Sequence, residues 1–326
     1  MFRKLHSALA AVALLACAGA AQAADWKPDK PIRLVIPFGP GGATDVVSRI
    51  VAAKVTETIG QPVVVENRAG GGGLIGMSAV RESRPDGYTL LVTTIGYGAN
   101  PALYRHKKIP YDPVKDFTLI TRTANIPTIL VVPPSLGVKT LQEFIDRAKA
   151  NPGTLSLGSA GYGTVNHLAG ELFKAETGIN TIHVPYRSGG LSIAAVVSGE
   201  ISALFATAPT ALGHIKNHAL VPLAMGNDGK LAALPDVEPV AKLLPGFDVP
   251  DWQGLLGPAG LPKDVVNTLN AQFAAALKDP EVVKRLADLG AVPANPTTPE
   301  EFLAFVTSEV KKWNSVADRT GMKAEN

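Results

Sequence analysis

The sequence contains a single cysteine, Cys17, among its 326 residues. Cys17 falls within an N-terminal segment that we expect to be removed, which would leave the mature chain without a thiol. Disulfide bonds and thiol catalysis are therefore excluded for the mature protein. Its stability must come from a hydrophobic core.

Charged residues are also scarce, at 18% of the chain, and the formal net charge is only +3. Proteins that bind nucleic acid need a large basic surplus against the phosphate backbone, so nucleic acid is excluded as a partner. After the N-terminal segment, no apolar run approaches the roughly 20 residues of a membrane-spanning helix. With 46% hydrophobic residues, the chain is long enough to build a large core divided between two lobes.

The N-terminus has the three parts of an export signal. Arg3 and Lys4 form a basic start, residues 8–16 an apolar run, and Ala21-Gln22-Ala23 a cleavage site of small residues. We therefore expect residues 1–23 to be a signal peptide and the mature protein to be periplasmic. The alternative is lipid attachment at Cys17 in the segment Leu14-Leu15-Ala16-Cys17, which we disfavour because the second leucine is bulky for that position.

After Trp26 the sequence alternates short β-branched runs with helical spacing, as in βαβ proteins. Ile32 to Ile36 is a predicted strand, followed by a helical pattern that ends at Gly60. A second series of this kind begins near Asn125. The capping box at residues 140–143 predicts a helix within it.

Three more helices are predicted to begin at Pro262, at Asp279-Pro280 and at Thr298. The last should pack back on the first lobe. We therefore predict an α/β fold with two lobes and two crossovers between them. Residues 24–122 and 228–326 would form lobe 1, and residues 123–227 would form lobe 2.

Two glycine-rich junctions, one in each lobe, are the most informative feature. Residues 38–45 read FGPGGATD and residues 158–164 read GSAGYGT, and each joins a strand to a helix. Glycine allows close approach of the main chain, and the free N–H groups of a helix N-terminus attract an anion. In an open α/β sheet the ligand crevice lies at the carboxyl ends of the strands, where both junctions fall.

Several side chains at these junctions have two interpretations that the sequence leaves open. Asp45 stabilises the dipole of its helix or accepts a hydrogen bond from a ligand. His167 either reaches the ligand or packs within its lobe. Tyr162 either offers an aromatic face or points to solvent. Taken singly, each junction would be an ordinary turn with Thr44 or Thr164 as the helix cap.

Other chemistries find little support. Residues 71–76 fit the spacing of a dinucleotide fingerprint, but no acidic residue ends a following strand. His214 and His218 lack the glutamate of a metalloprotease motif. Ser159 is not in a GxSxG elbow. We therefore predict no catalytic residue, no metal and no cofactor, and expect a binding protein rather than an enzyme.

The sequence resembles the Bug family, the substrate-binding proteins of tripartite tricarboxylate transporters of the TctC type. The resemblance covers essentially the whole mature chain, and its motifs are KPIRLVIPF (30–38), PGGATD (40–45), VVVENR (63–68), PDGYTL (85–90), NPALY (100–104), YDPVKDF (111–117), HLAGELF (167–173) and HVPY (183–186).

The resemblance implies a Venus-flytrap fold, type II-like, that pinches a small carboxylate between its lobes. It also implies membrane transporter components as partners, and we expect a monomer. A binding protein that reports to a sensor is the alternative, and an enzyme acting on a carboxylate is a more distant one. By similarity the ligand-binding residues would be Phe38, Gly42, Ala43, Thr44, Asp45, Thr94, Tyr97, Ser159, Ala160, Gly161, Gly163, Thr164, His167, Tyr186 and Phe205.

One departure from the family bears on the ligand. Many relatives have Phe-Asp-Asn where this chain has Phe205-Ala206-Thr207. Because an acidic side chain is missing there, we hypothesise that the pocket prefers an organic, dicarboxylic or aromatic acid without an ammonium group over acidic amino acids.

Overall fold

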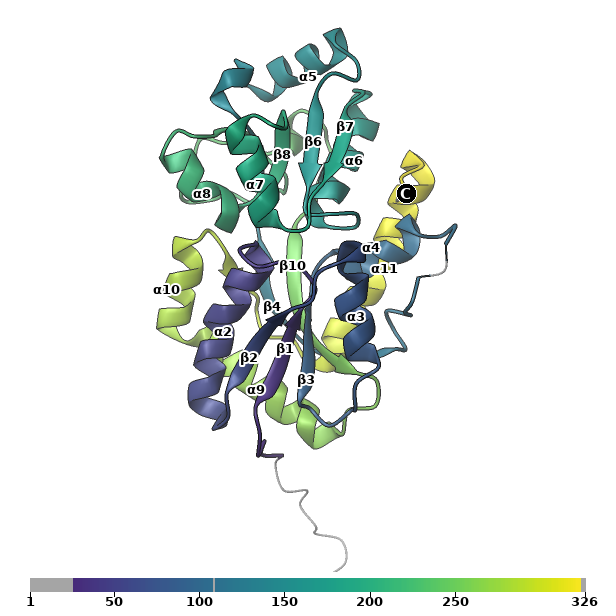
Figure 1. Cartoon of the computed structure of the whole chain (residues 1–326), viewed down its shortest axis with the longest axis vertical. Coiled ribbons are helices and arrows are strands. Elements are labelled where there is room, and N and C mark those ends of the chain that lie inside the picture. The colour runs from purple at the N-terminus through teal and green to yellow at the C-terminus, as the bar shows by residue number, and fades with distance from the viewer. Residues whose placement is uncertain (1–25, 108, 324–326) are drawn as a thin grey trace, which may run out of the picture.

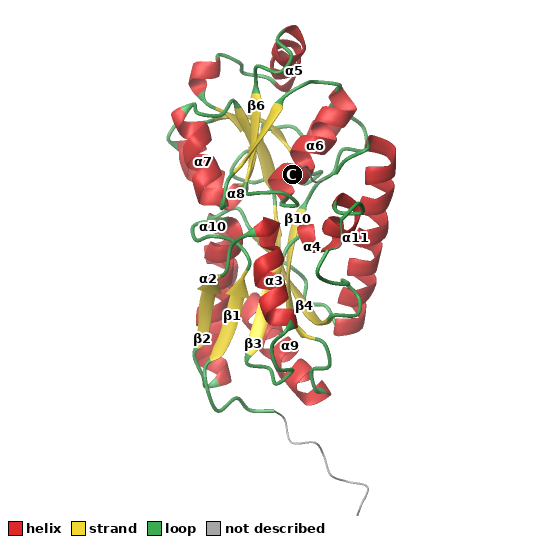
Figure 2. Ribbon diagram, turned by 45° about the vertical axis from the view of Figure 1, so that its right-hand side comes forward, coloured by secondary structure: helices red, strands yellow, loops and turns green. Residues whose placement is uncertain are grey.

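The computed structural model describes residues 26–107 and 109–323. The predicted signal peptide and Cys17 lie outside these residues. The described chain forms two α/β lobes, stacked along the long axis of the molecule (Figure 1). Each lobe is built on one β-sheet with helices on both of its faces (Figure 2).

The first sheet has six strands, in the order β11-β4-β10-β3-β1-β2. Strands β1, β2 and β3 are parallel, as the sequence predicted, whereas β10 runs antiparallel to both β3 and β4. The strands are β1 (Ile32–Ile36), β2 (Val63–Asn67), β3 (Thr89–Thr93), β4 (Phe117–Ile126), β10 (Asp251–Pro258) and β11 (Val292–Pro293).

Two groups of helices cover the first sheet. One hydrophobic cluster joins the sheet to α2 (Ala43–Ile59), α9 (Lys263–Lys278) and α10 (Pro280–Asp288). A second cluster joins it to α3 (Leu74–Arg81), α4 (Gly96–Leu103) and α11 (Pro299–Thr320). Leu90 and Leu91 alternate between the two clusters, as neighbouring residues of a buried strand should.

The second sheet has five strands, in the order β7-β6-β8-β5-β9. Helices α5 and α6 pack in one hydrophobic cluster, and α7 and α8 pack in another. The strands are β5 (Thr128–Val132), β6 (Ser156–Ser159), β7 (Ile182–Pro185), β8 (Ala203–Thr207) and β9 (Val221–Met225). The helices are α5 (Leu141–Ala150), α6 (Val165–Thr177), α7 (Gly189–Ser198) and α8 (Ala208–Lys216), and the short 3-10 turns of the chain are η1 (Gly71–Gly73), η2 (Pro134–Leu136) and η3 (Val240–Lys242).

The chain passes between the sheets twice. It leaves the first sheet after β4 and enters β5 through Pro127, and it returns from β9 into β10. The long helix α11 begins with the capping box of Thr298 and Glu301 and packs on α4 and β4, so it lies on the first lobe as predicted. Its C-terminal end also contacts α6, where Arg319 pairs with Glu176.

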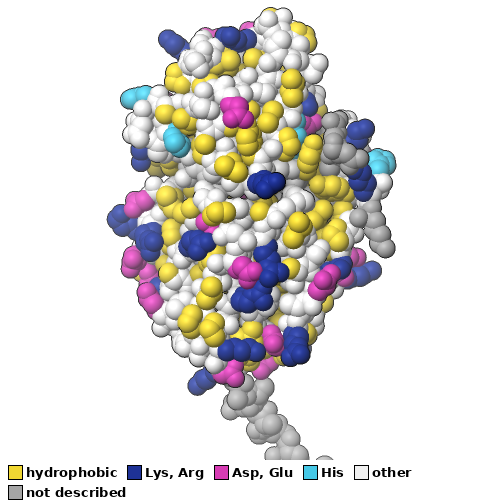
Figure 3. All heavy atoms as spheres, viewed as in Figure 1, with side chains coloured by type: hydrophobic (Ala, Val, Ile, Leu, Met, Phe, Trp, Pro, Cys, Tyr) yellow, Lys and Arg dark blue, Asp and Glu magenta, His cyan; other side chains and the backbone are white. Residues whose placement is uncertain are grey.

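The surface carries charges of both signs. On the face shown in Figure 3, basic and acidic side chains are interspersed over the lower lobe. Within the described part of the chain, none of the helices combines the length and the apolar character needed to cross a membrane.

Candidate ligand-binding site

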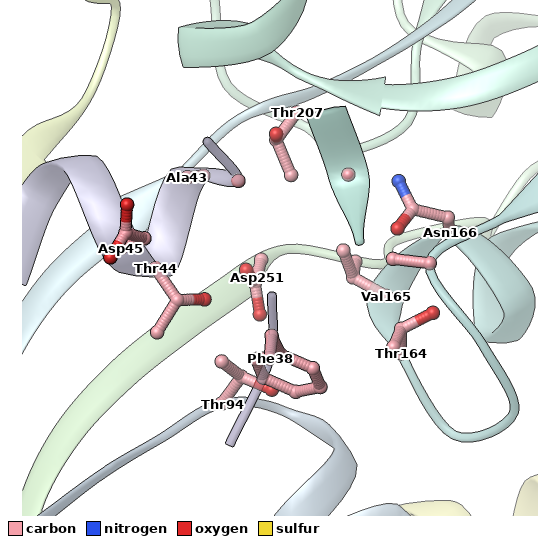
Figure 4. A pocket seen from close by; sticks show the side chains of 13 residues that line it. Phe38, Ala43, Thr44, Asp45, Thr94, Thr164, Val165, Asn166, Thr207 and Asp251 are labelled. Atoms are coloured by element: carbon pink, nitrogen blue, oxygen red, sulfur yellow. The ribbon is translucent and has the colours of Figure 1, made fainter. Parts of the chain in front are cut away.

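A pocket lies where the two lobes meet, with one wall from each junction. Its cavity volume in this structure is about 40 Å³, far below the roughly 300–1,000 Å³ of sites that hold a small molecule. Figure 4 shows the carboxyl group of Asp251 near the centre of the pocket, between Thr44 and Val165. The lining residues are Phe38, Gly42, Ala43, Thr44, Asp45, Thr94, Ala160, Thr164, Val165, Asn166, Gly189, Thr207 and Asp251.

Helix α2 supplies the first wall through its N-terminal turn. Gly42 is its N-cap, and no side chain caps the helix. The first N–H groups of a helix have no acceptor within the helix, so those of Ala43 and Thr44 remain available at this wall. The uncapped turn also places the positive end of the helix dipole at the pocket.

Asp45 holds this turn in place. Its Oδ2 accepts from the backbone N–H of Gly41 at 3.1 Å, and its Oδ1 accepts from Arg49 Nε and Asn67 Nδ2, each at 3.0 Å. Asn67 also donates to the carbonyl oxygen of Phe38 at 3.0 Å. Burial opposes ionisation of Asp45, but the donors from Arg49, Gly41 and Asn67 bring its pKa below the ordinary value. Both carboxylate oxygens are thus already engaged in shaping the junction.

Helix α6 supplies the facing wall in a similar way. Its N-cap, Thr164, does not cap the helix with its side chain but donates its hydroxyl to the carbonyl oxygen of Gly161 at 2.6 Å. The first turn therefore keeps its N–H groups free at Val165 and Asn166, both of which line the pocket. The side-chain nitrogen of Asn166 donates to the carbonyl oxygen of Phe205 at 2.5 Å, which ties this turn to β8.

Buried His167 and half-buried His183 support the second junction from behind. His183 Nε2 lies 2.7 Å from Ser159 Oγ, which also accepts from the N–H of Gly161 at 3.0 Å. His167 Nδ1 accepts from the N–H of Gly163 at 3.3 Å. Burial lowers the pKa of His167 to about 3 and that of His183 to about 4, so both rings are neutral at neutral pH. His167 is 3% exposed and lies outside the pocket lining.

Further helices begin at the same pocket. Thr207 is the N-cap of α8 and makes no side-chain cap, and Gly189 is the first residue of α7. Both residues line the pocket. Thr94 lines it just ahead of the N-terminus of α4. Five helices thus start around one cavity, and their dipoles favour a negatively charged guest. Free first-turn N–H groups are supplied mainly by α2 and α6, because Ser188 caps α7, and at the start of α8 the N–H of Ala208 donates to Pro127 and Pro209 has none.

Asp251 is the one charged residue of the lining besides Asp45. It opens strand β10, its side chain is 3% exposed, and its Oδ1 accepts from the N–H of Ile95 at 3.4 Å. Burial raises the pKa of Asp251 to about 7, and the N–H groups of Ile95 and Trp252 offset only part of this rise. Sequence reasoning did not predict Asp251 as a site residue.

The structure brings eight of the fifteen predicted residues into the pocket and leaves seven outside its lining. The eight are Phe38, Gly42, Ala43, Thr44, Asp45, Thr94, Ala160 and Thr164. Of the others, Ser159, Gly163 and His167 lie behind the second wall, as described above. Gly161 and Tyr186 line a neighbouring groove together with Tyr162, Arg187 and Gly70 to Gly73. This groove shares Phe38 and Ala160 with the pocket.

The two remaining predicted residues are core aromatics. Tyr97 stacks on Tyr111 and donates its hydroxyl to the carbonyl oxygen of Pro113 at 2.8 Å. Phe205 stacks on Phe247 and is fully buried. Tyr97 and Phe205 are close in sequence to residues that line the pocket. Their rings nevertheless lie outside it, because successive side chains of a strand or helix point to different faces.

Sequence reasoning missed Val165, Asn166, Gly189, Thr207 and Asp251. The first two follow directly from Thr164, since the first turn of an uncapped helix faces its anion site. Thr207 was noted only for its departure from the family pattern. The sequence comparison considered only the acidic residue missing at Ala206, whereas the structure adds Asp251, which reaches the pocket from a strand far along the chain.

The lobes touch through glycines around the pocket. A Cβ on Gly42 would lie 3.6 Å from the nitrogen of Gly189, so the walls meet backbone to backbone. A Cβ on Gly96 would overlap the carbonyl oxygen of Gly163, and one on Gly72 would overlap that of Tyr162. The structure is therefore a closed form.

A family model described as the tripartite tricarboxylate transporter family receptor, TctC, matches residues 47–322. The periplasmic binding protein BugD is 29% identical to this chain and has a TM-score of 0.87, with 91% of this chain and 100% of BugD covered.

Two similar solved structures contain a bound acid. A protein of R. palustris with adipate is 32% identical, with a TM-score of 0.86 and coverage of 91% of this chain and 99% of the other. MatC from Rhodopseudomonas palustris with bound malate is 32% identical, with a TM-score of 0.84 and coverage of 89% and 99%. The chain belongs to the tripartite tricarboxylate transporter receptor (TctC) family, which includes the Bug proteins, and is a periplasmic-type solute-binding protein rather than an enzyme.

Proposed function

We propose that this protein captures a small organic, dicarboxylic or aromatic acid in the periplasm and delivers it to the membrane components of a tripartite tricarboxylate transporter. The observation that carries the proposal is the pocket at the N-termini of five helices, where α2, α6 and α8 lack side-chain caps. Such a site is built for a carboxylate, and it needs no arginine or lysine to bind one.

The donors present are sufficient for useful affinity. Hydrogen bonds to a charged group contribute roughly 1.5–3 kcal/mol each. Several donors from each wall would reach the approximately −8 kcal/mol of micromolar binding after the costs of ordering the ligand and closing the lobes. The hydroxyl of Thr44 adds to the main-chain donors, whereas that of Thr164 already donates to Gly161 and helps to fix the second wall.

The fifteen predicted ligand-binding residues and the predicted lobe bounds at residues 123 and 227 belong to this proposal. The eight predicted residues that line the pocket would contact the ligand directly. Ser159, Gly163 and His167 would act through the shape of the second wall. The periplasmic location rests on the family and on the predicted signal peptide at residues 1–23.

A thermal-shift screen with adipate, malate and aromatic carboxylates, each beside its uncharged amide, tests the proposal. We expect at least one acid to raise the melting temperature in a concentration-dependent way and its amide to have no effect, because the helix N-termini select the negative charge. Equal effects of acids and amides, or no effect of any acid, would contradict it. Thr307→Ala, on the outer helix α11, serves as a control variant that should respond like the wild type.

The ligand-bound protein could deliver its acid to a transporter or report it to a sensor, and these are two distinct functions. Uptake of the identified acid in cells that carry or lack the neighbouring membrane components separates them. Loss of uptake on deleting this chain supports delivery, whereas unchanged uptake contradicts it and favours the sensor.

A further inference from the structure

Asp251 is a buried carboxyl group placed inside an anion-binding pocket. It is 3% exposed, it lines the pocket, and its donors are two backbone N–H groups, that of Ile95 at a long 3.4 Å from Oδ1 and that of Trp252. None of the described lining residues is a lysine, an arginine or a histidine. An ionised carboxylate removed from water needs a cation or several strong donors, so this one is poorly compensated.

The elements around Asp251 do not supply the missing cation. On α2, Arg49 is engaged with Asp45, at 2.8 Å. On α6, His167 is neutral through burial. Helices α4 and α7 contain no charged residue, and α8 has its basic residues, His214 and Lys216, in its last turn, away from the pocket.

The sheet that carries Asp251 offers no partner either. On α11, Glu309 accepts from Trp252 Nε1 at 2.9 Å. Trp252 follows Asp251 in β10, so the two side chains point to opposite faces of the sheet. On β4, Arg122 lies over the ring of Phe305 and donates to Asn125 at 2.5 Å.

A second anion in this pocket would repel an ionised Asp251 at short range in a low-dielectric environment. We propose that Asp251 couples ligand capture to a proton, so that its carboxyl group is protonated in the complex and donates its O–H to a carboxylate oxygen of the ligand. This inference rests on the proposed function. The proton comes from solution, and no covalent bond is made or broken.

In this closed form burial raises the pKa of Asp251 to about 7 despite the N–H groups of Ile95 and Trp252, so the closed protein without ligand holds this proton part of the time at neutral pH. A bound carboxylate would raise it further. Asp251 is then a specificity-determining residue, because its protonated form offers a donor that suits a carboxylate or carbonyl oxygen and has no negative charge to pair with an ammonium group. The preference for acids without an ammonium group thus gains a physical basis.

The test compares the affinity for adipate and malate at about pH 6 and about pH 8.5 by calorimetry. If only the protonated form binds, a pKa of about 7 gives a dissociation constant about 30-fold larger at the higher pH. The same titrations in buffers of different ionisation enthalpy should show close to one proton taken up per ligand at the higher pH.

Two variants separate the proton from other effects. Asp251→Asn keeps the shape of the protonated acid and should bind both acids with an affinity that changes less than about threefold between the two pH values. Asp45→Asn should keep the wild-type pH dependence, whatever its affinity, because Asp45 is held ionised by Arg49 and Asn67. Ionisation of the ligand itself affects all three proteins equally.

Each outcome has a separate meaning. Equal wild-type affinity at both pH values, or an unchanged pH dependence in Asp251→Asn, overturns the proton coupling while leaving carboxylate capture intact. Binding of neither acid at the lower pH overturns capture of these acids, and the coupling with it. Carboxyl NMR of the free protein adds a test without ligand, since an Asp251 midpoint near the ordinary aspartate pKa of about 4 also overturns the coupling.

Discussion

Gly96 and Gly163 face each other across the closed cleft, and neither has room for a larger side chain. A Cβ on Gly96 would overlap the carbonyl oxygen of Gly163, and a Cβ on Gly163 would overlap Oδ1 of Asn100. Gly96 begins α4 in the first lobe, and Gly163 precedes α6 in the second. The contact exists only when the lobes are closed, so the side-chain volume at these positions controls closure rather than folding of either lobe.

We therefore expect Gly96→Ala to weaken ligand binding by at least about tenfold, because the methyl group would overlap the Gly163 carbonyl and disfavour the closed state that the ligand selects. Calorimetry with the acid identified in the screen measures the loss. Small-angle scattering should show a form that stays extended when ligand is added. The matched control is Gly213→Ala in α8, where a Cβ would meet nothing within 4 Å. Equal affinity of both variants would contradict the role of this contact.

A second prediction concerns Thr164. Its hydroxyl donates to the carbonyl oxygen of Gly161 at 2.6 Å and lies at the pocket wall. Thr164→Ala should raise the dissociation constant about tenfold, which corresponds to loss of about 1.4 kcal/mol, with little change in melting temperature. Thr164→Ser retains the hydroxyl and should restore most of the affinity. Failure of the serine variant to recover binding would assign the effect to the lost methyl group instead.

Much of the fold could be predicted because its signals are local. The strand Ile32–Ile36, the helix that ends at Gly60 and the three C-terminal helices all appear where their caps and β-branched runs indicated. Strand β10 was missed because it is buried on both faces and therefore lacks alternation, and because Gly254, Gly257 and Pro258 interrupt it.

The contrast between local and long-range signals also explains which residues of the candidate site could be predicted. Thr44 and Thr164 could be predicted since each sits in a glycine-rich strand-to-helix junction that is readable in one stretch of sequence. Asp251 could not, since it enters the pocket from a strand inserted antiparallel between β3 and β4. No local pattern reports such a long-range pairing. The rings of Tyr97 and Phe205 likewise follow tertiary packing, which directs them into the core.

Asp45 should be needed for stability as well as for the shape of the first junction. Asp45→Asn removes the charge that accepts from Gly41 and Arg49, and we expect it to lower the free energy of unfolding by about 2 kcal/mol at neutral pH. Because the pKa of Asp45 is lowered in the folded protein, its contribution is present above the unfolded value of 3.8 and is lost as the pH falls through the folded value.

Denaturant titrations of wild type and Asp45→Asn at several pH values check this. The difference between the two proteins should be constant near neutrality and shrink toward zero in acid. A difference that grows as the pH falls would show that the carboxylate is not stabilised in the folded state.

Asp251 should behave in the opposite sense in the closed protein without ligand. Burial raises its folded pKa to about 7, above the ordinary 3.8, so the stability associated with its protonated form is fully present below the unfolded pKa. That stability is lost as the pH rises through about 7. The wild type should therefore lose up to about 4 kcal/mol relative to Asp251→Asn between acid and mildly alkaline pH.

Thermal unfolding of both proteins without ligand, at about pH 4, 5.5, 7 and 8.5, measures this difference. The melting temperatures should converge in acid, where wild-type Asp251 is neutral like asparagine, and separate as the pH rises, with the variant the more stable. All other titrating groups are common to the two proteins and cancel. Parallel curves would mean that Asp251 is ionised in the folded protein throughout this range, and that the pocket stabilises its charge with donors other than Ile95 and Trp252.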